Sequence, residues 1–351
     1  MQTLMHKSDF YKWIVVICLL VTTKVSCQTT QPIEQIGRLL DDALFFSDNY
    51  ITPATDAAVY QASSNWVTTP KKKALWDVSL SIHTNVFFVP KSDRNFVISN
   101  SDFSFFTIEN ATSAIVPTAL GNDAQVWLVG QLTTNPGDEN TPPTTTEVRL
   151  KSPEGIDQES VVYPYLQGSI GLWYGTEFVA KYSTNVKLKK GHYQVYGAGL
   201  KHNFSQYFKN IEAKNIYFSG FFGYSKEDIT FNFLDVQTDF GNLGLNEITG
   251  LVDTWQFQIN ASKQWKKWEV MSAIISNTSD FKYQIGGPKG QIEELLPFQS
   301  LVNKKLEEIY KSKTNYIGEV SCRYQISKIY VQTSFAFGKF VNSNFSIQYE
   351  F

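Results

Sequence analysis

The sequence predicts an all-β protein, a transmembrane antiparallel β-barrel preceded by a short helix. Three observations predict this fold: an amino-terminal export signal, long stretches in which apolar and polar residues alternate, and a last strand that ends on an aromatic residue. Aromatic residues make up 15% of the 351 residues, yet the mean hydropathy is only −0.22. Rings interleaved with polar residues are typical of a sheet with one apolar face and one wet face.

The charge balance limits the classes of function. The chain has 31 Lys and Arg against 33 Asp and Glu, which gives a formal net charge of −2. Nucleic-acid binders usually carry an excess of basic charge, so we expect no nucleic-acid partner. Charged residues are 18% of the chain, too few for a highly charged disordered protein.

The first 27 residues have the order of a secretory signal peptide. Lys7 and Lys12 precede a nine-residue apolar run at 13–21, and small residues follow it. This run is too short to span a bilayer, which needs roughly 20 residues. We therefore expect residues 1–27 to be removed by cleavage after Cys27.

A lipoprotein signal is the alternative for the same segment, with Cys27 acylated as the new amino terminus. Lys24 stands where that signal prefers an aliphatic residue, which favours ordinary cleavage. Cleavage leaves Cys322 as the single cysteine of the mature chain. We therefore expect no internal disulfide, no cysteine-ligated metal and no cofactor.

Residues 28–70 form the second predicted unit, a periplasmic or plug segment. Apolar residues recur with helical spacing after Pro32, which suits the first helical position. The predicted amphipathic helix ends near Pro53, because proline disrupts a helix interior. Residues 57–66 are expected to add at most one further short turn.

The third predicted unit, residues 71–351, is the barrel. Apolar and polar residues alternate from Trp76 to Phe88, longer than an ordinary strand of about 5–6 residues and suited to a tilted membrane strand of roughly 9–11. A soluble β-sandwich also alternates, but its strands are shorter. Similar alternation recurs at 166–174, 178–182, 216–224, 254–261, 329–337 and 344–351.

The last nine residues favour the membrane barrel over the sandwich. Phe345, Ile347, Tyr349 and Phe351 alternate with polar residues, and the chain stops on an aromatic ring. This ending resembles the carboxy-terminal signature of bacterial outer-membrane barrels. It implies that the assembly machinery recognises Phe351 and that the outer membrane of a bacterial cell, with its lipid, is the location of the protein.

The spacing of the connections predicts about 14 strands. Ten are expected between residues 162 and 351, and four between 75 and 151. Twelve is the alternative, because the alternation at 96–146 is irregular. Short turns that alternate with longer loops are typical of outer-membrane barrels, whose short turns face the periplasm. Either even count places both termini in the periplasm.

Several motifs in the middle of the chain resemble a known family. Pro-Tyr-Leu-Gln-Gly-Ser-Ile-Gly-Leu at 164–172 precedes Gly-Thr-Glu at 175–177, and Gly-Ala-Gly-Leu-Lys-His at 197–202 precedes Gln206. They resemble an uncharacterised family of outer-membrane barrels from Bacteroidetes, distantly similar to FadL-type transporters of hydrophobic compounds. The resemblance implies a barrel with a helical stretch after the signal. It implies no activity, and transport is a fold-level analogy.

Charged and histidine side chains on the predicted wet faces are candidate lumen-lining residues, since a charge facing lipid is costly. Mutual ion pairing that stiffens the interior and selection of a solute are both open roles for them. The candidates are His83, Glu177, Lys181, Lys201, His202, Glu269, Glu319 and Arg323.

Catalysis is the weakest interpretation of these residues. Some membrane barrels are hydrolases built from serine, histidine and an acid, and His83 stands near Asp77 and Ser81. The sequence contains no Gly-x-Ser-x-Gly motif, and no second acid lies at a suggestive spacing from His83. We expect a protein that is not an enzyme and has no catalytic residues.

Two functions remain. The leading hypothesis is a passive channel or transporter of small solutes, hydrophobic ones included, because a wall of about 14 strands leaves a lumen to fill. The alternative is a structural or surface-interaction barrel with a sealed lumen and no transport.

Overall fold

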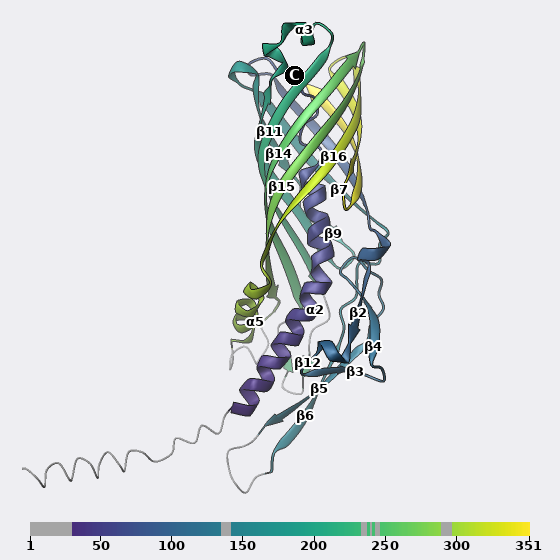
Figure 1. Cartoon of the computed structure of the whole chain (residues 1–351), viewed down its shortest axis with the longest axis vertical. Helices are drawn as coiled ribbons and strands as arrows, with labels where there is room; N and C mark the ends of the chain where they lie inside the picture. The colour runs from purple at the N-terminus through teal and green to yellow at the C-terminus, as the bar shows by residue number, and fades with distance from the viewer. Residues whose placement is uncertain (1–29, 135–141, 233–236, 239–240, 243–245, 289–296) are drawn as a thin grey trace, which may run out of the picture.

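The structure is a closed antiparallel barrel around an amino-terminal helix (Figure 1). It is a computed structural model that describes residues 30–134, 142–232, 237–238, 241–242, 246–288 and 297–351. The predicted signal, residues 1–27, lies outside the described residues. The expected fold class, an antiparallel barrel with a helix before it, is confirmed.

Ten strands form the ring of the barrel. The main sheet has 11 strands, of which β9 pairs only with β10, while the other ten close on themselves through the β10–β11 pairing. In ring order the strands are β1 (Val78–Phe88), β7 (Ser160–Gly171), β8 (Thr176–Tyr182), β10 (Gly191–Asn203), β11 (Ile216–Asn232), β14 (Glu247–Trp265), β15 (Trp268–Gly286), β16 (Lys311–Ile326), β17 (Ile329–Phe337) and β18 (Val341–Glu350).

The expected count of 14 strands, and the alternative of 12, are not confirmed. The four upstream strands were expected between residues 75 and 151, but only β1 of that stretch enters the ring. The rest forms two small separate sheets, β2–β4 and β3–β5–β6, whose strands of 3 to 8 residues are too short for a tilted membrane strand of about 9–11. Their bounds are β2 (Asn95–Ser99), β3 (Phe106–Ile108), β4 (Ser113–Pro117), β5 (Trp127–Thr134) and β6 (Thr144–Lys151).

The connections differ at the two ends of the barrel. At one end, the turn end, β14 and β15 are joined by Lys266-Lys267, and β16 and β17 by Ser327-Lys328. Lys266 and Ser327 have φ of 52° and 59°, as a tight hairpin turn requires. Phe351 also lies at the turn end, because its backbone N–H donates to the carbonyl of Val78 at 3.0 Å.

At the opposite end, the loop end, the connections are mostly long. Residues 89–159 between β1 and β7 fold into the two small sheets; we call their described part the lobe (Figure 1). The remaining short elements are η1 (Lys91–Asp93) and η2 (Asn100–Asp102) in the lobe, η3 (Trp173–Gly175), η4 (Ser205–Tyr207) and α3 (Lys209–Glu212) at the turn end, and β9 (Val186–Leu188), β12 (Gln237–Thr238), β13 (Gly241–Asn242), α5 (Phe298–Leu306) and η5 (Glu307–Ile309) toward the loop end.

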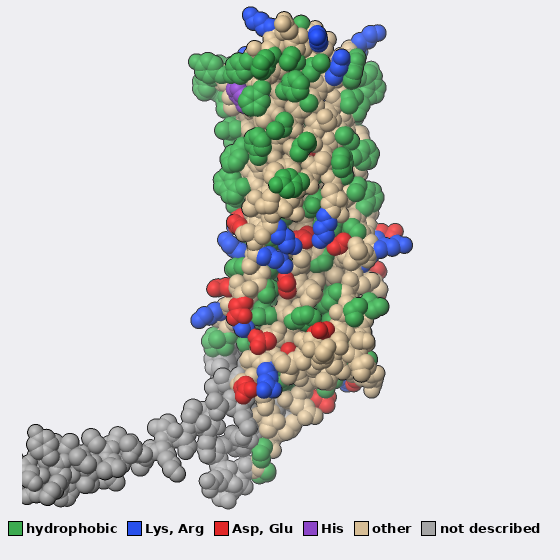
Figure 2. Space-filling model, viewed as in Figure 1, with side chains coloured by type: hydrophobic (Ala, Val, Ile, Leu, Met, Phe, Trp, Pro, Cys, Tyr) green, Lys and Arg blue, Asp and Glu red, His purple; other side chains and the backbone are tan. Residues whose placement is uncertain are grey.

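A few basic side chains stand at the rim of the turn end, the outer face next to them is apolar, and side chains of both charges gather on the outside closer to the loop end (Figure 2). Trp265 and Trp268 border the apolar band at the turn end, and Trp255 and Tyr316 border its other side, as aromatic girdles do in membrane barrels. The exposed apolar residues include Leu80, Ile82, Leu166, Phe178, Leu200, Phe222, Phe257, Ile259, Val270, Ile274, Val320, Phe335, Phe345 and Ile347.

Helix α2 (Thr30–Ser63) runs from outside the loop end into the barrel (Figure 1). It is longer than the sequence predicts, because it continues through Pro53 instead of ending there. An interior proline costs a helix about 3 kcal/mol, and burial of Ile51, Ala54 and Ala58 against the wall offsets this cost. No helix among the described residues is both long enough and apolar enough to cross a membrane.

The path of α2 also corrects the expected position of the amino terminus. Both termini were expected on the same side, whereas α2 begins with Thr30 beyond the loop end and Phe351 lies at the turn end (Figure 1). The reason is that α2 enters from the loop end and the chain crosses the lumen once, from Tyr50 to Lys73, before β1 begins.

The apolar band makes a testable prediction. Ile274 is 70% exposed in the middle of β15, and arginine at the lipid midplane costs about 2–4 kcal/mol. Ile274→Arg should therefore lower the free energy of unfolding by that amount, measured by urea titration of the heat-modifiable band on a detergent gel. The control is Gln284→Arg, on the same face of β15 beyond the band, which should change stability little. Equal effects of the two substitutions would contradict the placement of the band.

Candidate functional site

The candidate site is the lumen. Seven of the eight residues that the sequence nominated as lumen-lining have buried side chains facing the interior: His83, Glu177, Lys181, Lys201, Glu269, Glu319 and Arg323. They alternate with the exposed apolar residues of the same strands, because successive side chains of a strand point to opposite faces. The wall therefore carries its charges inward.

His202 is the exception and does not line the lumen. Its neighbours Lys201 and Asn203 point inward, so the ring of His202 lies on the outer face near the turn end. Its Nδ1 is 2.9 Å from Oγ1 of Thr176, and its Nε2 is 3.1 Å from the hydroxyl of Tyr207.

A continuous segment of the chain occupies this lumen. We call residues 50–73 the plug; it comprises the second half of α2 and the extended stretch that follows Ser63. Ile51, Val59, Ala62 and Ser64 are completely buried, and Trp66 stacks on Phe221 of the wall. Of the predicted unit 28–70, residues 50–70 lie in the lumen, and the part of α2 before Tyr50 lies beyond it.

Lys181 binds the end of α2. Its Nζ donates to the carbonyl oxygens of Ala62, at 3.1 Å, and Ser64, at 2.7 Å. It also lies over the rings of Trp66 and Tyr165, with 4.5 and 4.7 Å between Nζ and the centroids. The last carbonyls of a helix lack partners and form the negative end of its dipole, so a lysine is well placed there.

Glu319 binds the residue at which the helix ends. Asn65 has a φ of 63°, the left-handed conformation that commonly ends a helix and that asparagine tolerates. The backbone N–H of Asn65 donates to Oε2 of Glu319 at 2.7 Å. Gln167 adds a third contact of this kind by donating to the carbonyl of Trp66 at 3.0 Å.

A second group of charges holds the end of the plug near the turn end. Glu177 forms ion pairs with Lys73, at 3.2 Å, and with Lys201. Lys201 in turn donates to the carbonyl oxygens of Thr69 and Lys71, at 2.8 and 3.1 Å. The wall therefore binds the extended part of the plug through the plug's backbone as well as through its side chains.

Glu269 and Arg323 extend this group across the lumen. Glu269 accepts hydrogen bonds from Thr69, at 2.8 Å, and Ser262, at 2.7 Å, and pairs with Lys71 at 3.4 Å. Arg323 lies 3.7 Å from Glu269 and donates to Gln348 and Glu350 at 2.8 and 2.7 Å. The charges that the sequence nominated bind one another and the plug.

His83 takes part in a chain of three groups. Its Nε2 is 2.9 Å from the Ser81 hydroxyl and its Nδ1 is 3.0 Å from Oδ1 of Asn344, while its ring stacks on Tyr165 at 4.5 Å. This is the order of a serine–histidine–amide triad. All three polar side chains are buried, and Ser81 already donates to the carbonyl of Gln167 at 3.1 Å, so the chain serves as a satisfied polar network of the interior.

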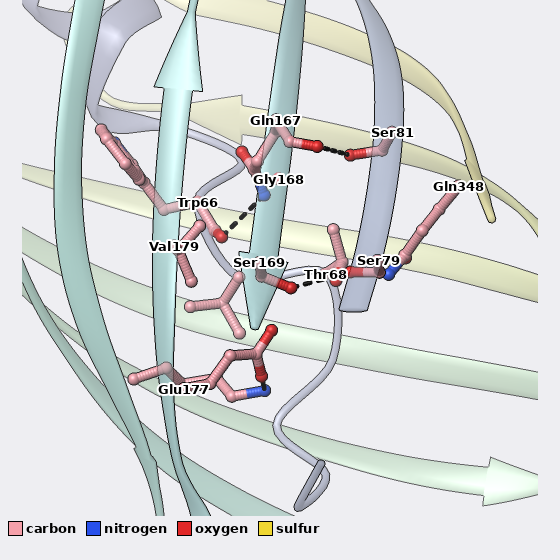
Figure 3. A pocket seen from close by; sticks show the side chains of 12 residues that line it. Trp66, Thr68, Ser79, Ser81, Gln167, Gly168, Ser169, Glu177, Val179 and Gln348 are labelled. Carbon is pink, nitrogen blue, oxygen red and sulfur yellow. Dashed lines mark hydrogen bonds and ion pairs between the residues drawn. The ribbon is translucent and has the colours of Figure 1, made fainter. Parts of the chain in front are cut away.

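A narrow polar gap, without room for a water molecule, lies beside this network. Figure 3 shows that its lining comes from the wall strands and from Trp66 and Thr68 of the plug. Ser79 and Ser169 face each other across it at 2.7 Å, and Lys73 donates to both. The plug thus forms one side of this gap and packs against the wall across it.

Sequence reasoning missed the acidic residues of α2 that bind the loop end. Asp48 pairs with Lys311 at 2.6 Å, and Asp56 pairs with Lys313 and Lys339 at 2.8 and 3.0 Å. Burial alone would lower the pKa of Lys339, but its hydrogen bond and attraction to Asp56 raise that pKa above the usual value. The acidic residues on an otherwise apolar helix were the available signal.

Asp42 joins the helix to the lobe. Its carboxylate is 3% exposed and accepts the backbone N–H groups of Ser104, Phe105 and Phe106, each at 2.8 Å. The Ser104 hydroxyl donates to it as well, at 3.0 Å. Within the described part of the chain, no group of three or more His, Cys, Asp or Glu side chains is arranged to hold a metal ion.

Comparison with known proteins identifies the family of this chain. The profile of a family of unknown function, DUF6588, matches residues 5–351. This chain belongs to that family. The uncharacterised family that the motifs resemble is confirmed to this extent, as one of unknown function.

The solved structures that match this chain resemble it only in general outline. The translocator domain of the autotransporter NalP from Neisseria meningitidis is 8% identical, with 87% of this chain and 99% of that chain covered and a TM-score of 0.32. The outer-membrane protease OmpT from Escherichia coli is 9% identical, with 81% and 100% covered and a TM-score of 0.28. The transport unit of the autotransporter AIDA-I from Escherichia coli is 9% identical, with 85% and 98% covered and a TM-score of 0.27. No curated protein matches the chain.

The contacts of Lys181 predict the effect of removing it. Lys181→Met leaves the buried carbonyl of Ser64 without its donor, whereas the carbonyl of Ala62 keeps Nε1 of Trp66 as a donor at 2.7 Å. One orphaned buried group costs about 1–3 kcal/mol, so the free energy of unfolding should fall by that amount in a urea titration. The matched control is Lys187→Met on the exposed side of β9, which should be nearly neutral. Loss of equal stability in both variants would refute the anchoring role of Lys181.

The contacts of Asp42 predict selective release of the lobe. Asp42→Ala should weaken lobe docking by about 2–4 kcal/mol, because buried N–H groups lose their acceptor. Limited proteolysis should cut residues 89–159 faster, while the heat-modifiable migration of the barrel stays unchanged. Asp41→Ala is the control, since Asp41 makes a single exposed pair with Lys305. Unchanged proteolysis of the Asp42 variant would show that other contacts hold the lobe.

Proposed function

We propose that this protein is an outer-membrane β-barrel sealed by its own plug, and that it acts as a structural or surface-interaction protein through its loop end. The observation that carries the proposal is the bonding of Lys181, Lys201 and Glu319 to the backbone of the plug. These side chains bind main-chain groups of the segment that blocks the lumen. Such contacts hold the plug inside the ring.

The exterior of the ring supports the membrane location and the orientation. An apolar band between two aromatic girdles matches the surface that lipid covers in bacterial barrels, whose short turns face the periplasm and whose long loops face outward. The two-residue turns then lie in the periplasm and the lobe outside the cell. Recognition of Phe351 by the assembly machinery, and contact of the band with outer-membrane lipid, belong to the same proposal.

Packing energies favour a sealed lumen over an open one. If the plug left, water would solvate the wall charges, but side chains such as Ile51, Val59 and Trp66 would lose their burial. Full burial of a large apolar side chain is worth about 1.5–3 kcal/mol. The burial of several such side chains adds to the hydrogen bonds of the plug, so the plug is not expected to leave the lumen spontaneously.

A passive channel for small solutes is the second candidate. It is favoured by inward polar side chains that bind one another rather than the plug: Gln256 donates to Gln258 at 3.4 Å, and Gln258 donates to Asn260 at 2.6 Å. Such a surface would suit a hydrated passage if the plug moved. The likeness of the motifs to FadL-type transporters of hydrophobic compounds belongs to this candidate. We propose no enzymatic activity under either.

Conductance separates the two candidates. In planar bilayers, the sealed barrel should show no steady conductance, while a variant lacking residues 28–66 should conduct because the lumen then contains water. For a passive channel, the intact protein should already conduct.

A cross-link provides a test that does not depend on how the deletion variant folds. Oγ of Ser64 and Nδ2 of Asn342 are 3.2 Å apart, so Ser64→Cys with Asn342→Cys, in a Cys322→Ser chain, can tie the plug to β18. If the barrel is sealed, the double variant should show the same conductance baseline whether the disulfide is formed or reduced. Conductance that appears on reduction, in a protein whose uncross-linked parent also conducts, would favour the channel and overturn the sealed barrel.

A further inference from the structure

We propose that the barrel carries its own amino-terminal segment through the ring and presents it on the outside of the cell beside the lobe. This inference rests on the orientation in the proposed function, but it concerns a different property, namely which way the plug is threaded. The observation that carries it is the direction of the chain: α2 begins at the loop end, and the plug ends at Lys73 near the turn end (Figure 1).

Contacts along α2 place its first half outside the membrane region. Oε1 of Gln35 accepts the backbone N–H of Thr133 at 2.8 Å, and the Tyr50 hydroxyl donates to the carbonyl of Glu154 at 2.6 Å. Together with Asp42, these residues bind the lobe, which belongs to the long β1–β7 connection. The first 20 or so residues of α2 therefore lie with the loop end, and none of these contacts involves the turn end.

Length excludes a return of this segment to the turn end. Helix α2 has 34 residues, and a rise of about 1.5 Å per residue makes it about 50 Å long. The hydrocarbon core of a bilayer is about 30 Å thick. Because α2 is one continuous helix that is held to the lobe at Gln35 and Asp42 and enters the lumen at Tyr50, its beginning lies on the side of the lobe.

Charge complementarity fixes the direction of threading. Toward the loop end, acidic residues of the helix meet basic residues of the wall: Asp48 meets Lys311, and Asp56 meets Lys313. Near the turn end the signs are reversed, because basic Lys71 and Lys73 of the plug meet Glu269 and Glu177. Insertion in the opposite direction would bring like charges together at both ends, which is unfavourable in an interior of low dielectric.

Closure of the ring makes the threading a consequence of the topology. The plug continues directly into β1, which pairs with β18 on one edge and with β7 on the other. The chain between Thr30 and Lys73 therefore passes through a complete ring. Whether the ring closes around the plug or the segment enters a finished ring, the beginning of α2 is delivered to the loop end.

Cysteine labelling on intact cells tests the inference. In a chain carrying Cys322→Ser, three single variants are compared: Glu34→Cys at the start of α2, Asp123→Cys in the lobe and Lys267→Cys in the β14–β15 turn, all at exposed positions. A membrane-impermeant maleimide should label the first two in intact cells and the third only after the outer membrane is permeabilised. Heat-modifiable migration checks that each variant is folded, and the Cys322→Ser parent gives the background.

The outcomes separate this inference from the proposed function. If Asp123→Cys is labelled in intact cells while Glu34→Cys requires permeabilisation, the barrel is oriented as proposed but its amino-terminal segment is not presented outside, and the inference is overturned. If Lys267→Cys is labelled in intact cells and the other two are not, the orientation itself is wrong and the inference fails with it.

Discussion

Buried charge in the lumen needs partners, and the backbone of the plug supplies them. The stretch after Ser63 has neither helical nor sheet partners for its own carbonyls and N–H groups, so it depends equally on the wall. Lys181 and Lys201 donate to carbonyls of this backbone, and Glu319 accepts one of its N–H groups. Removal of either side leaves unsatisfied groups on the other, so the ring and the plug are best regarded as one folding unit.

The size of the ring explains why a helix fits there. Barrels of about eight strands are filled by side chains, whereas those of 16 or more enclose a channel. Ten strands fall between, and a helix of about 10–12 Å diameter is the natural filling. Close approach is helped by small residues: a Cβ at Gly250 of β14 would lie 2.4 Å from Cγ2 of Thr55, and Ala54, Ala57 and Ala58 face the wall.

The alternation of apolar and polar residues made the barrel and the inward direction of most of its charged side chains predictable. The number of strands and the length of α2 depend on tertiary structure and were not predictable in the same way. The inward direction of Lys181 or Glu319 follows from strict alternation, which a single sequence displays. The direction of His202 was predicted wrongly although alternation holds there, because Lys201 and Asn203 point inward and the residue between them must point outward. The strand count failed at residues 96–151, since short alternating segments of a lobe look like strands of a wall. That Pro53 lies inside a helix depends on tertiary packing, which no local pattern records.

The height of the wall follows from the length of the helix. Strands β14 and β15 have 19 residues each, about twice what the bilayer requires, and their extra length continues beyond the apolar band. There the wall binds α2 through Lys311 and Lys313, on the strand next to β15, while the lobe binds the helix through Asp42. A helix of about 50 Å that filled only the part of the ring inside the apolar band would leave its apolar face in water. The long strands and the lobe together cover that face, so the part of the protein beyond the apolar band follows from placing a long helix in a narrow ring.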